Sequence, residues 1–149
     1  MKGRNTMLFT VQKTDNTGDV VFVTGETRCG VIKGIWKSET LRPVIGKSYN
    51  IELTLGLGTG AVDRRDVKTA SGQAKTSISV SDGKVLFTGI CEAVEDIYFI
   101  RFSDDGLEML DIENDDHTIK AGDHITFYLP FEETVLNHSF QTGLLQEMF

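Results

Sequence analysis

The chain has 149 residues, a mass of 16.5 kDa, a formal net charge of −7 and a pI near 4.9. Its hydrophobic share of 40% and charged share of 25% are typical of a soluble globular protein of one domain. No apolar run approaches the ~20 residues that cross a bilayer, and the start "MKGRNTMLF" lacks the apolar core of an export signal. We therefore expect no membrane association and a cytoplasmic location. Cys29 and Cys91 are too few for a disulfide scaffold and should be reduced.

Charge is distributed unevenly along the sequence. Residues 1–75 hold 12 Lys and Arg against 7 Asp and Glu, a balance of +5. Residues 76–149 hold 3 Lys and Arg against 15 Asp and Glu, a balance of −12. Such asymmetry says little about the fold. It suggests instead a charged surface that binds a partner. The alternative is that both kinds of charge are mixed over one solvated exterior.

Alternation with a period of two predicts β-structure along most of the chain. In "YNIELTL" (49–55) the apolar side chains occupy every second position, as in a strand with one buried face. Asp-Gly and Thr-Gly turns separate such segments. Strands are predicted over 7–13, 19–27, 31–37, 49–55, 75–80, 84–93, 96–102, 107–112 and 124–129. Short strands at this spacing predict an all-β fold, an antiparallel barrel or sandwich of about 8–10 strands.

Two passages resemble each other and suggest an internal repeat within a single compact domain, 1–149. Segments 19–32 and 83–97 both contain a strand that ends in Thr-Gly. Segments 46–53 and 122–129 both begin with Gly-x-x and continue with apolar residues at every second position. The pseudo-repeat halves would be 1–55 and 75–131, with a glycine-rich loop, 56–74, between them. Gly25 and Gly46 lie 21 positions apart, but Gly89 and Gly122 lie 33 apart. The difference predicts an additional acidic hairpin in the second half.

The last segment, 133–149, places apolar residues four positions apart, which predicts a short C-terminal helix capping a barrel end. A final strand is the alternative.

Motifs for catalysis, metals and cofactors fail in detail. The glycines of 56–60 have the spacing G-x-G-x-G, which lacks both the dinucleotide fingerprint and the phosphate-loop lysine. A calcium loop starting at Asp111 requires Gly where Asp116 stands and Glu where Gly122 stands. The three histidines have no partner at metal-ligand spacing. We therefore predict no catalytic residues, no metal and no cofactor, and expect that the protein is not an enzyme.

The acids of the second half are the strongest functional signal. From Glu92 to Asp123, 11 acids stand against Arg101 and Lys120. A surface of one sign raises the association rate with an oppositely charged partner, and aromatic residues supply anchors beside it. The main hypothesis is therefore an acidic protein-binding module, in its sharpest form an immunity or antitoxin protein that occludes a basic, nuclease-like toxin domain. The predicted partner-binding residues are Tyr98, Asp104, Asp105, Asp111, Glu113, Asp115 and Asp116.

Two other classes of function stay open. A small β-barrel binds single-stranded nucleic acid or a small ligand through basic and aromatic side chains, although a pI near 4.9 disfavours nucleic acid. The residues for this alternative are Trp36, Lys37, Tyr49, Arg64 and Arg65. A structural or assembly subunit is the third class, and an unpaired edge strand would permit a homodimer.

Overall fold

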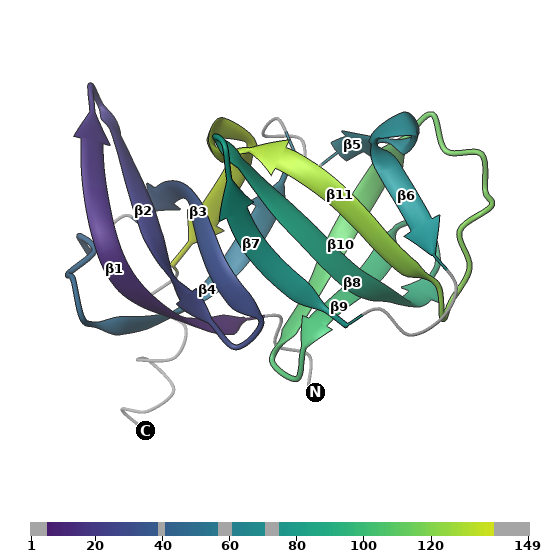
Figure 1. Cartoon of the computed structure of the whole chain (residues 1–149), viewed down its shortest axis with the longest axis horizontal. Helices are drawn as coiled ribbons and strands as arrows, with labels where there is room; N and C mark the ends of the chain where they lie inside the picture. Colours follow the sequence, from purple (N-terminus) through teal and green to yellow (C-terminus); the bar gives the residue numbers. More distant parts are fainter. Residues whose placement is uncertain (1–5, 39–40, 57–60, 71–74, 139–149) are drawn as a thin grey trace.

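Strands make up nearly all the regular structure in the computed structural model, which describes residues 6–38, 41–56, 61–70 and 75–138 (Figure 1). The strands of these ranges are β1 (Met7–Thr17), β2 (Val20–Thr27), β3 (Gly30–Lys37), β4 (Ser48–Leu55), β5 (Ala61–Asp63), β6 (Val67–Ala70), β7 (Ser77–Ser81), β8 (Lys84–Val94), β9 (Tyr98–Ser103), β10 (Gly106–Glu113), β11 (His124–Pro130) and β12 (Thr134–Asn137). Two single-turn 3-10 helices, η1 (Arg64–Asp66) and η2 (Phe131–Glu133), lie between strands. The predicted all-β class is confirmed.

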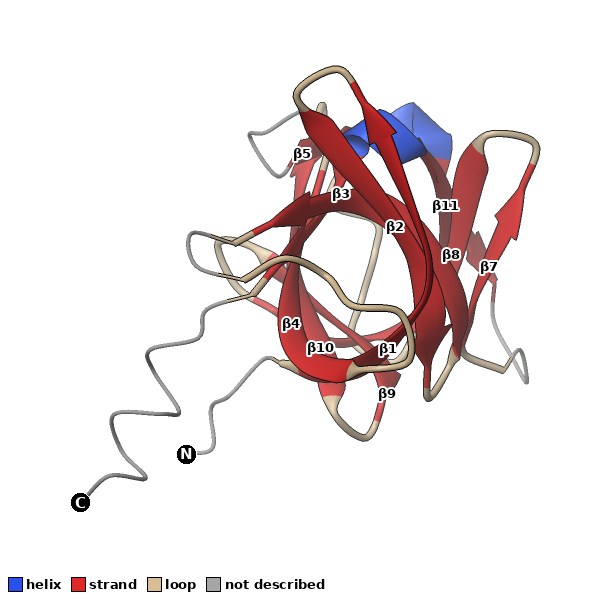
Figure 2. Cartoon of the chain, turned by 90° about the vertical axis from the view of Figure 1, so that its left-hand side faces the viewer, coloured by secondary structure: helices blue, strands red, loops and turns tan. Residues whose placement is uncertain are grey.

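Five strands close into the first barrel. The ring runs β1, β2, β3, β12 and β4, and β4 pairs with β1 to complete it. All neighbours are antiparallel except β3 and β12, which are parallel. Figure 2 looks into this ring from one end. Alternate residues of each strand point inward, so that Phe9, Val23, Ile32 and Ile51 are fully buried.

The second half of the chain builds a ring with the same order. β8, β9 and β10 are successive antiparallel neighbours, and β11 pairs with β8. The gap between β10 and β11 is filled by one segment, 61–70, whose β5 runs parallel to β10 and whose β6 runs antiparallel to β11. η1 joins these two short strands. Segment 61–70 was expected to be part of a loop, because its polar sequence shows no alternation.

Each ring therefore has four strands from one part of the chain and a fifth strand from a segment that directly follows the strands of the other ring. The chain leaves β4 of the first barrel to form 61–70 in the second ring, and it leaves β11 of the second ring to form β12 in the first barrel. The buried apolar residues of both rings form one continuous cluster. This exchange of fifth strands places the two rings side by side (Figure 1).

Equivalent hydrogen bonds mark equivalent positions in the two rings. The Gly46 amide donates to the Val11 carbonyl at 2.8 Å, and the Gly122 amide donates to the Cys91 carbonyl at 2.7 Å. Val11 and Cys91 both precede a register shift in the first strand of their ring. Gly46 and Gly122 both have a positive φ, 90° and 98°, which glycine adopts without steric cost.

The acidic segment is not an additional hairpin. Residues 114–123 connect β10 to β11 as residues 38–47 connect β3 to β4. The Thr-Gly pairs misled the spacing argument, since Gly25 lies on β2, the second strand of its ring, whereas Gly89 lies on β8, the first.

The expected C-terminal helix is not seen. Residues 134–137 form β12, in agreement with the alternative of a final strand, and residues 139–149 lie outside the described ranges. In the portion of the chain that is described, no helix has the length and apolarity needed to span a membrane.

Candidate functional site

The predicted acidic residues all lie on the second ring, but they differ in what they do. Asp104 and Asp105 form the turn between β9 and β10. Asp104 is exposed. The Asp105 carboxylate accepts hydrogen bonds from the Leu8 amide at 3.0 Å and the Ser103 hydroxyl at 2.6 Å, and it lies 3.9 Å from the Arg28 guanidinium. Asp105 therefore attaches this turn to β1 and to the β2–β3 turn.

Asp115 is held by Tyr98. The Tyr98 side chain is buried on β9, and its hydroxyl donates to Asp115 at 2.6 Å. Burial, followed by the hydrogen bond to Asp115, raises the pKa of Tyr98 to about 12. Burial opposes ionisation of Asp115, but hydrogen bonds from Tyr98 and the His117 amide outweigh it and lower the pKa of that carboxyl. Tyr98 thus positions Asp115 and with it the acidic connection, residues 114–118, that follows β10.

Asp116 forms an ion pair with Arg64, one of the residues predicted for the alternative function. The two side chains meet at 3.0 Å because segment 61–70 lies beside β10. The Arg64 guanidinium also donates to the Thr118 hydroxyl and the Val67 carbonyl. This guanidinium therefore fastens the exchanged segment to the acidic connection.

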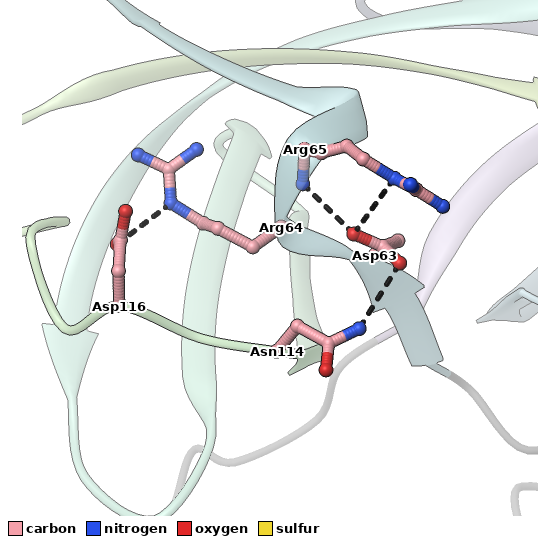
Figure 3. A pocket seen from close by; sticks show the side chains of 5 residues that line it. All are labelled: Asp63, Arg64, Arg65, Asn114 and Asp116. Carbon is pink, nitrogen blue, oxygen red and sulfur yellow. Dashed lines mark hydrogen bonds and ion pairs between the residues drawn. The ribbon is translucent and has the colours of Figure 1, made fainter.

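A surface pocket of about 430 Å³ opens at this junction. It is lined by Asp63, Arg64, Arg65, Asn114 and Asp116 (Figure 3). Asp63 accepts from the Arg65 amide at 2.9 Å and from the Asn114 side chain at 3.1 Å. Asp116 was predicted for the acidic site and Arg64 and Arg65 for the alternative one, and strand exchange brings them together with Asp63 and Asn114, which belonged to neither.

Asp111 and Glu113 project from the outward face of β10 and are exposed. Neither they nor Asp104 form an ion pair with any residue of the described ranges. On the same face, Met109 is 51% exposed. Sequence reasoning missed Met109, although its position between buried Glu108 and Leu110 in the alternation marks it as outward.

Trp36 and Tyr49 lie at one end of the first barrel and are mostly buried. Their rings meet edge to face with centroids 5.0 Å apart, and His138 packs against both. The Trp36 indole donates to the Leu41 carbonyl at 3.0 Å, and the Tyr49 hydroxyl accepts from the Val44 amide at 3.1 Å. The Trp36 and Tyr49 side chains therefore fix the connection between β3 and β4. Lys37 beside them is exposed.

Glu108 is a buried carboxyl that the sequence interpretation did not single out. Only 3% of it is exposed, and one carboxyl oxygen, Oε2, has no hydrogen-bond partner. Burial raises its pKa well above the usual value, aided by the neighbouring Glu52 charge and opposed by a hydrogen bond with the Leu53 backbone. The sequence does mark Glu108 as inward-facing, because it lies two and four positions before the apolar residues Leu110 and Ile112 on β10.

Within the described ranges, no three His, Cys, Asp or Glu side chains gather as a metal site would require. Both cysteines are free thiols. Comparison of the chain with models of known protein families, with curated proteins and with solved structures finds no match.

Proposed function

We propose that this protein is an acidic protein-binding module that covers the basic surface of a partner, most concretely an immunity-type inhibitor of a nuclease-like toxin. The observation that carries the proposal is the set of exposed carboxylates without an ion pair in the described ranges, Asp104, Asp111 and Glu113, along one strand and its preceding turn. Unpaired surface charge of one sign accelerates encounter with an oppositely charged surface.

The paired acids support the same proposal in another way. Three acids accept hydrogen bonds within the protein. Asp105 accepts from the Leu8 amide, Asp115 from the Tyr98 hydroxyl and Asp116 from the Arg64 guanidinium. They hold the β9–β10 turn and the 114–118 connection in place on either side of the free carboxylates. A surface that is already ordered loses less entropy when a partner binds.

Capture of partners on the immobilised full-length protein tests the proposal. A basic protein from the native host should be retained at low ionic strength and released at high ionic strength. The triple variant Asp104→Asn, Asp111→Asn, Glu113→Gln should weaken that retention by about tenfold or more, since rim charges control association.

The matched control removes the same charge elsewhere. Asp15, Asp19 and Asp82 are exposed acids outside this face, and their triple Asn variant should retain the partner as the unmodified protein does. Equal retention by both triple variants would show that the β10 face is not the binding site.

Binding of single-stranded nucleic acid is the second candidate, favoured by the ring connectivity. Small five-stranded barrels of the OB type bind oligonucleotides on the face of their second and third strands. Here that face is partly covered in the first barrel, where the Lys33 ammonium lies 4.5 Å from the centre of the Phe131 ring of η2. In the second ring it carries Asp111 and Glu113. Quenching of Trp36 fluorescence by an oligo-dT strand would favour this candidate over the first.

An assembly role, including a homodimer, has one supporting feature. From Lys13 to Thr17, β1 pairs with β2 along one edge, and no described strand pairs along the other. Such an edge can add a strand from a second copy. Light scattering that gives twice the monomer mass, lost when Asn16 is replaced by Pro, would support this role.

A further inference from the structure

An apolar row crosses the outward face of β8, β9 and β10. Ala93 stands opposite Phe99, and Phe99 stands opposite Met109. Side chains of directly opposed residues lie on the same face of a sheet. Met109 is 51% exposed and the other two are half-buried. Three neighbouring strands therefore present contiguous apolar surface to solvent.

Charged groups border this row unequally. On one side Arg101 is engaged, because its guanidinium donates to the Glu92 carboxylate and to the Ser103 and Asp104 carbonyls. On the other side Asp111 and Glu113 continue the outward face of β10, and neither forms an ion pair with a described residue. The border therefore offers negative charge and no uncompensated positive charge.

The first barrel shows what the equivalent face does when it is occupied. There β2 and β3 hold the corresponding positions, and the other half of the chain packs on them. Lys33 lies over the Phe131 ring of η2, with its ammonium 4.5 Å from the ring centre. In the second ring the corresponding face carries Met109, which is 51% exposed, and Phe99, which is half-buried. The apolar row of the second ring is therefore left partly exposed to solvent.

We infer that the β8–β10 face docks an amphipathic cationic segment of the partner, with an apolar side chain on the Phe99–Met109 row and Lys or Arg beside Asp111 and Glu113. This inference rests on the proposed function and adds the chemistry of the partner. Charge alone would be satisfied by any basic surface. The apolar row limits recognition to basic surfaces that also present exposed aliphatic or aromatic side chains, because only those remove Phe99 and Met109 from water.

Two labelled peptides of equal length and charge distinguish charge from apolar recognition. In one, Lys alternates with Leu, and in the other, Lys alternates with Ser. Fluorescence anisotropy with the full-length protein should give about tenfold tighter binding of the Lys-Leu peptide, the factor expected for burying one or two apolar side chains.

Variants then assign the effect to residues. Met109→Ser should bring the affinity for the Lys-Leu peptide to within about twofold of that for the Lys-Ser peptide. Ile45→Ser is the control, because Ile45 is an exposed apolar residue, 62% accessible, on the first barrel; it should leave both affinities unchanged. Asp111→Asn with Glu113→Gln should weaken both peptides equally.

The outcomes separate the two proposals. If both peptides bind equally well, or if Met109→Ser preserves the preference for Lys-Leu, the apolar docking inference is overturned and the acidic binding module stands. If the Asp111 and Glu113 variant binds both peptides as the unmodified protein does, the proposed function itself is overturned.

Discussion

The buried Glu108 carboxyl makes a specific prediction at the scale of single residues. Its pKa is raised in the folded state, chiefly by burial, so the unfolded chain releases this proton at lower pH than the native protein does. Glu108 therefore reduces stability as pH rises above the unfolded value of 4.5. Replacing Glu108 by Gln should make the free energy of unfolding higher at pH 8 than in the unmodified protein, with the difference shrinking toward about pH 4.

Glu92→Gln is the control of opposite sign. The hydrogen bond from Arg101 lowers the pKa of Glu92, so its stabilisation is present at neutral pH and is lost as pH falls through the folded-state pKa. This variant should be less stable than the unmodified protein near pH 7 and should match it in acid. Urea unfolding across the pH range measures both differences. A pH-independent effect of Glu108→Gln would contradict a raised pKa of Glu108 in the folded protein.

Tyr98 is expected to act through Asp115. Tyr98→Phe removes the hydroxyl that bonds Asp115 at 2.6 Å and should cost about 1 kcal/mol of stability. In an ultraviolet titration of the phenols, the component that ionises near pH 12 should disappear in this variant. If the late-titrating phenol persists in Tyr98→Phe, the signal belongs to another tyrosine.

Alternation in the sequence predicts much of this residue-level arrangement. It places Tyr98 inward and Phe99 outward, and it aligns Glu108 with buried Leu110 and Ile112. The interpretation by charge and aromatic character noted Phe99 as a possible anchor but chose Tyr98 for the site, and it missed Met109 and Glu108. Hydrogen bonds that occupy Asp105, Asp115 and Asp116 depend on residues far away in the chain, such as Leu8 and Arg64, and no local pattern reports them.

At the scale of elements, β12 is the strand that closes the first barrel, and it passes close to Gly34 of β3. A Cβ on Gly34 would stand 2.3 Å from the Thr134 carbonyl oxygen. Gly34→Ala should therefore displace β12 and reduce the free energy of unfolding by about 3 kcal/mol.

The control for this prediction is Gly46→Ala. Gly46 has a φ of +90° but no atom within 4 Å of an added Cβ, so the substitution should cost about 1 kcal/mol through backbone conformation alone. Denaturant melts of both variants compare the two costs. A Gly34→Ala variant no less stable than Gly46→Ala would mean that β12 does not pack against β3 as described.

The nine segments with clear alternation were predictable as strands, because each has one buried face. Segment 61–70 was not, because η1 interrupts it and its two strands are only three and four residues long. Which ring a fifth strand joins is decided by pairing over long sequence distances, for example β12 with β3. Local periodicity contains no information about that choice.

At the scale of the whole molecule, the exchanged strands should make the two rings unfold together. Loss of either ring removes the closing strand of the other, and the buried residues form one cluster. Trp36, the single tryptophan, reports the first barrel, and hydrogen exchange of β9 amides reports the second ring. Both should show the same midpoint in urea. Two separate transitions would show that the rings are independent domains.

Strand exchange also changes the meaning of the charge asymmetry along the sequence. Arg64 and Arg65 belong to the basic half of the sequence but lie on the acidic second ring, where they pair with Asp116 and Asp63. Among the acids of the second ring that the sequence singles out, Asp104, Asp111 and Glu113 remain without an ion pair in the described ranges. A charge count along the sequence identifies the acidic region but not this neutralisation.

The most direct test of the central claim is a map of amide chemical shifts in the full-length protein during titration with the Lys-Leu peptide. The perturbed amides should cluster on β9 and β10 around Phe99, Met109 and Asp111, and Met109→Ser should need about tenfold more peptide to reach the same shifts. Perturbations centred on Trp36, Lys37 and Tyr49 of the first barrel would contradict it.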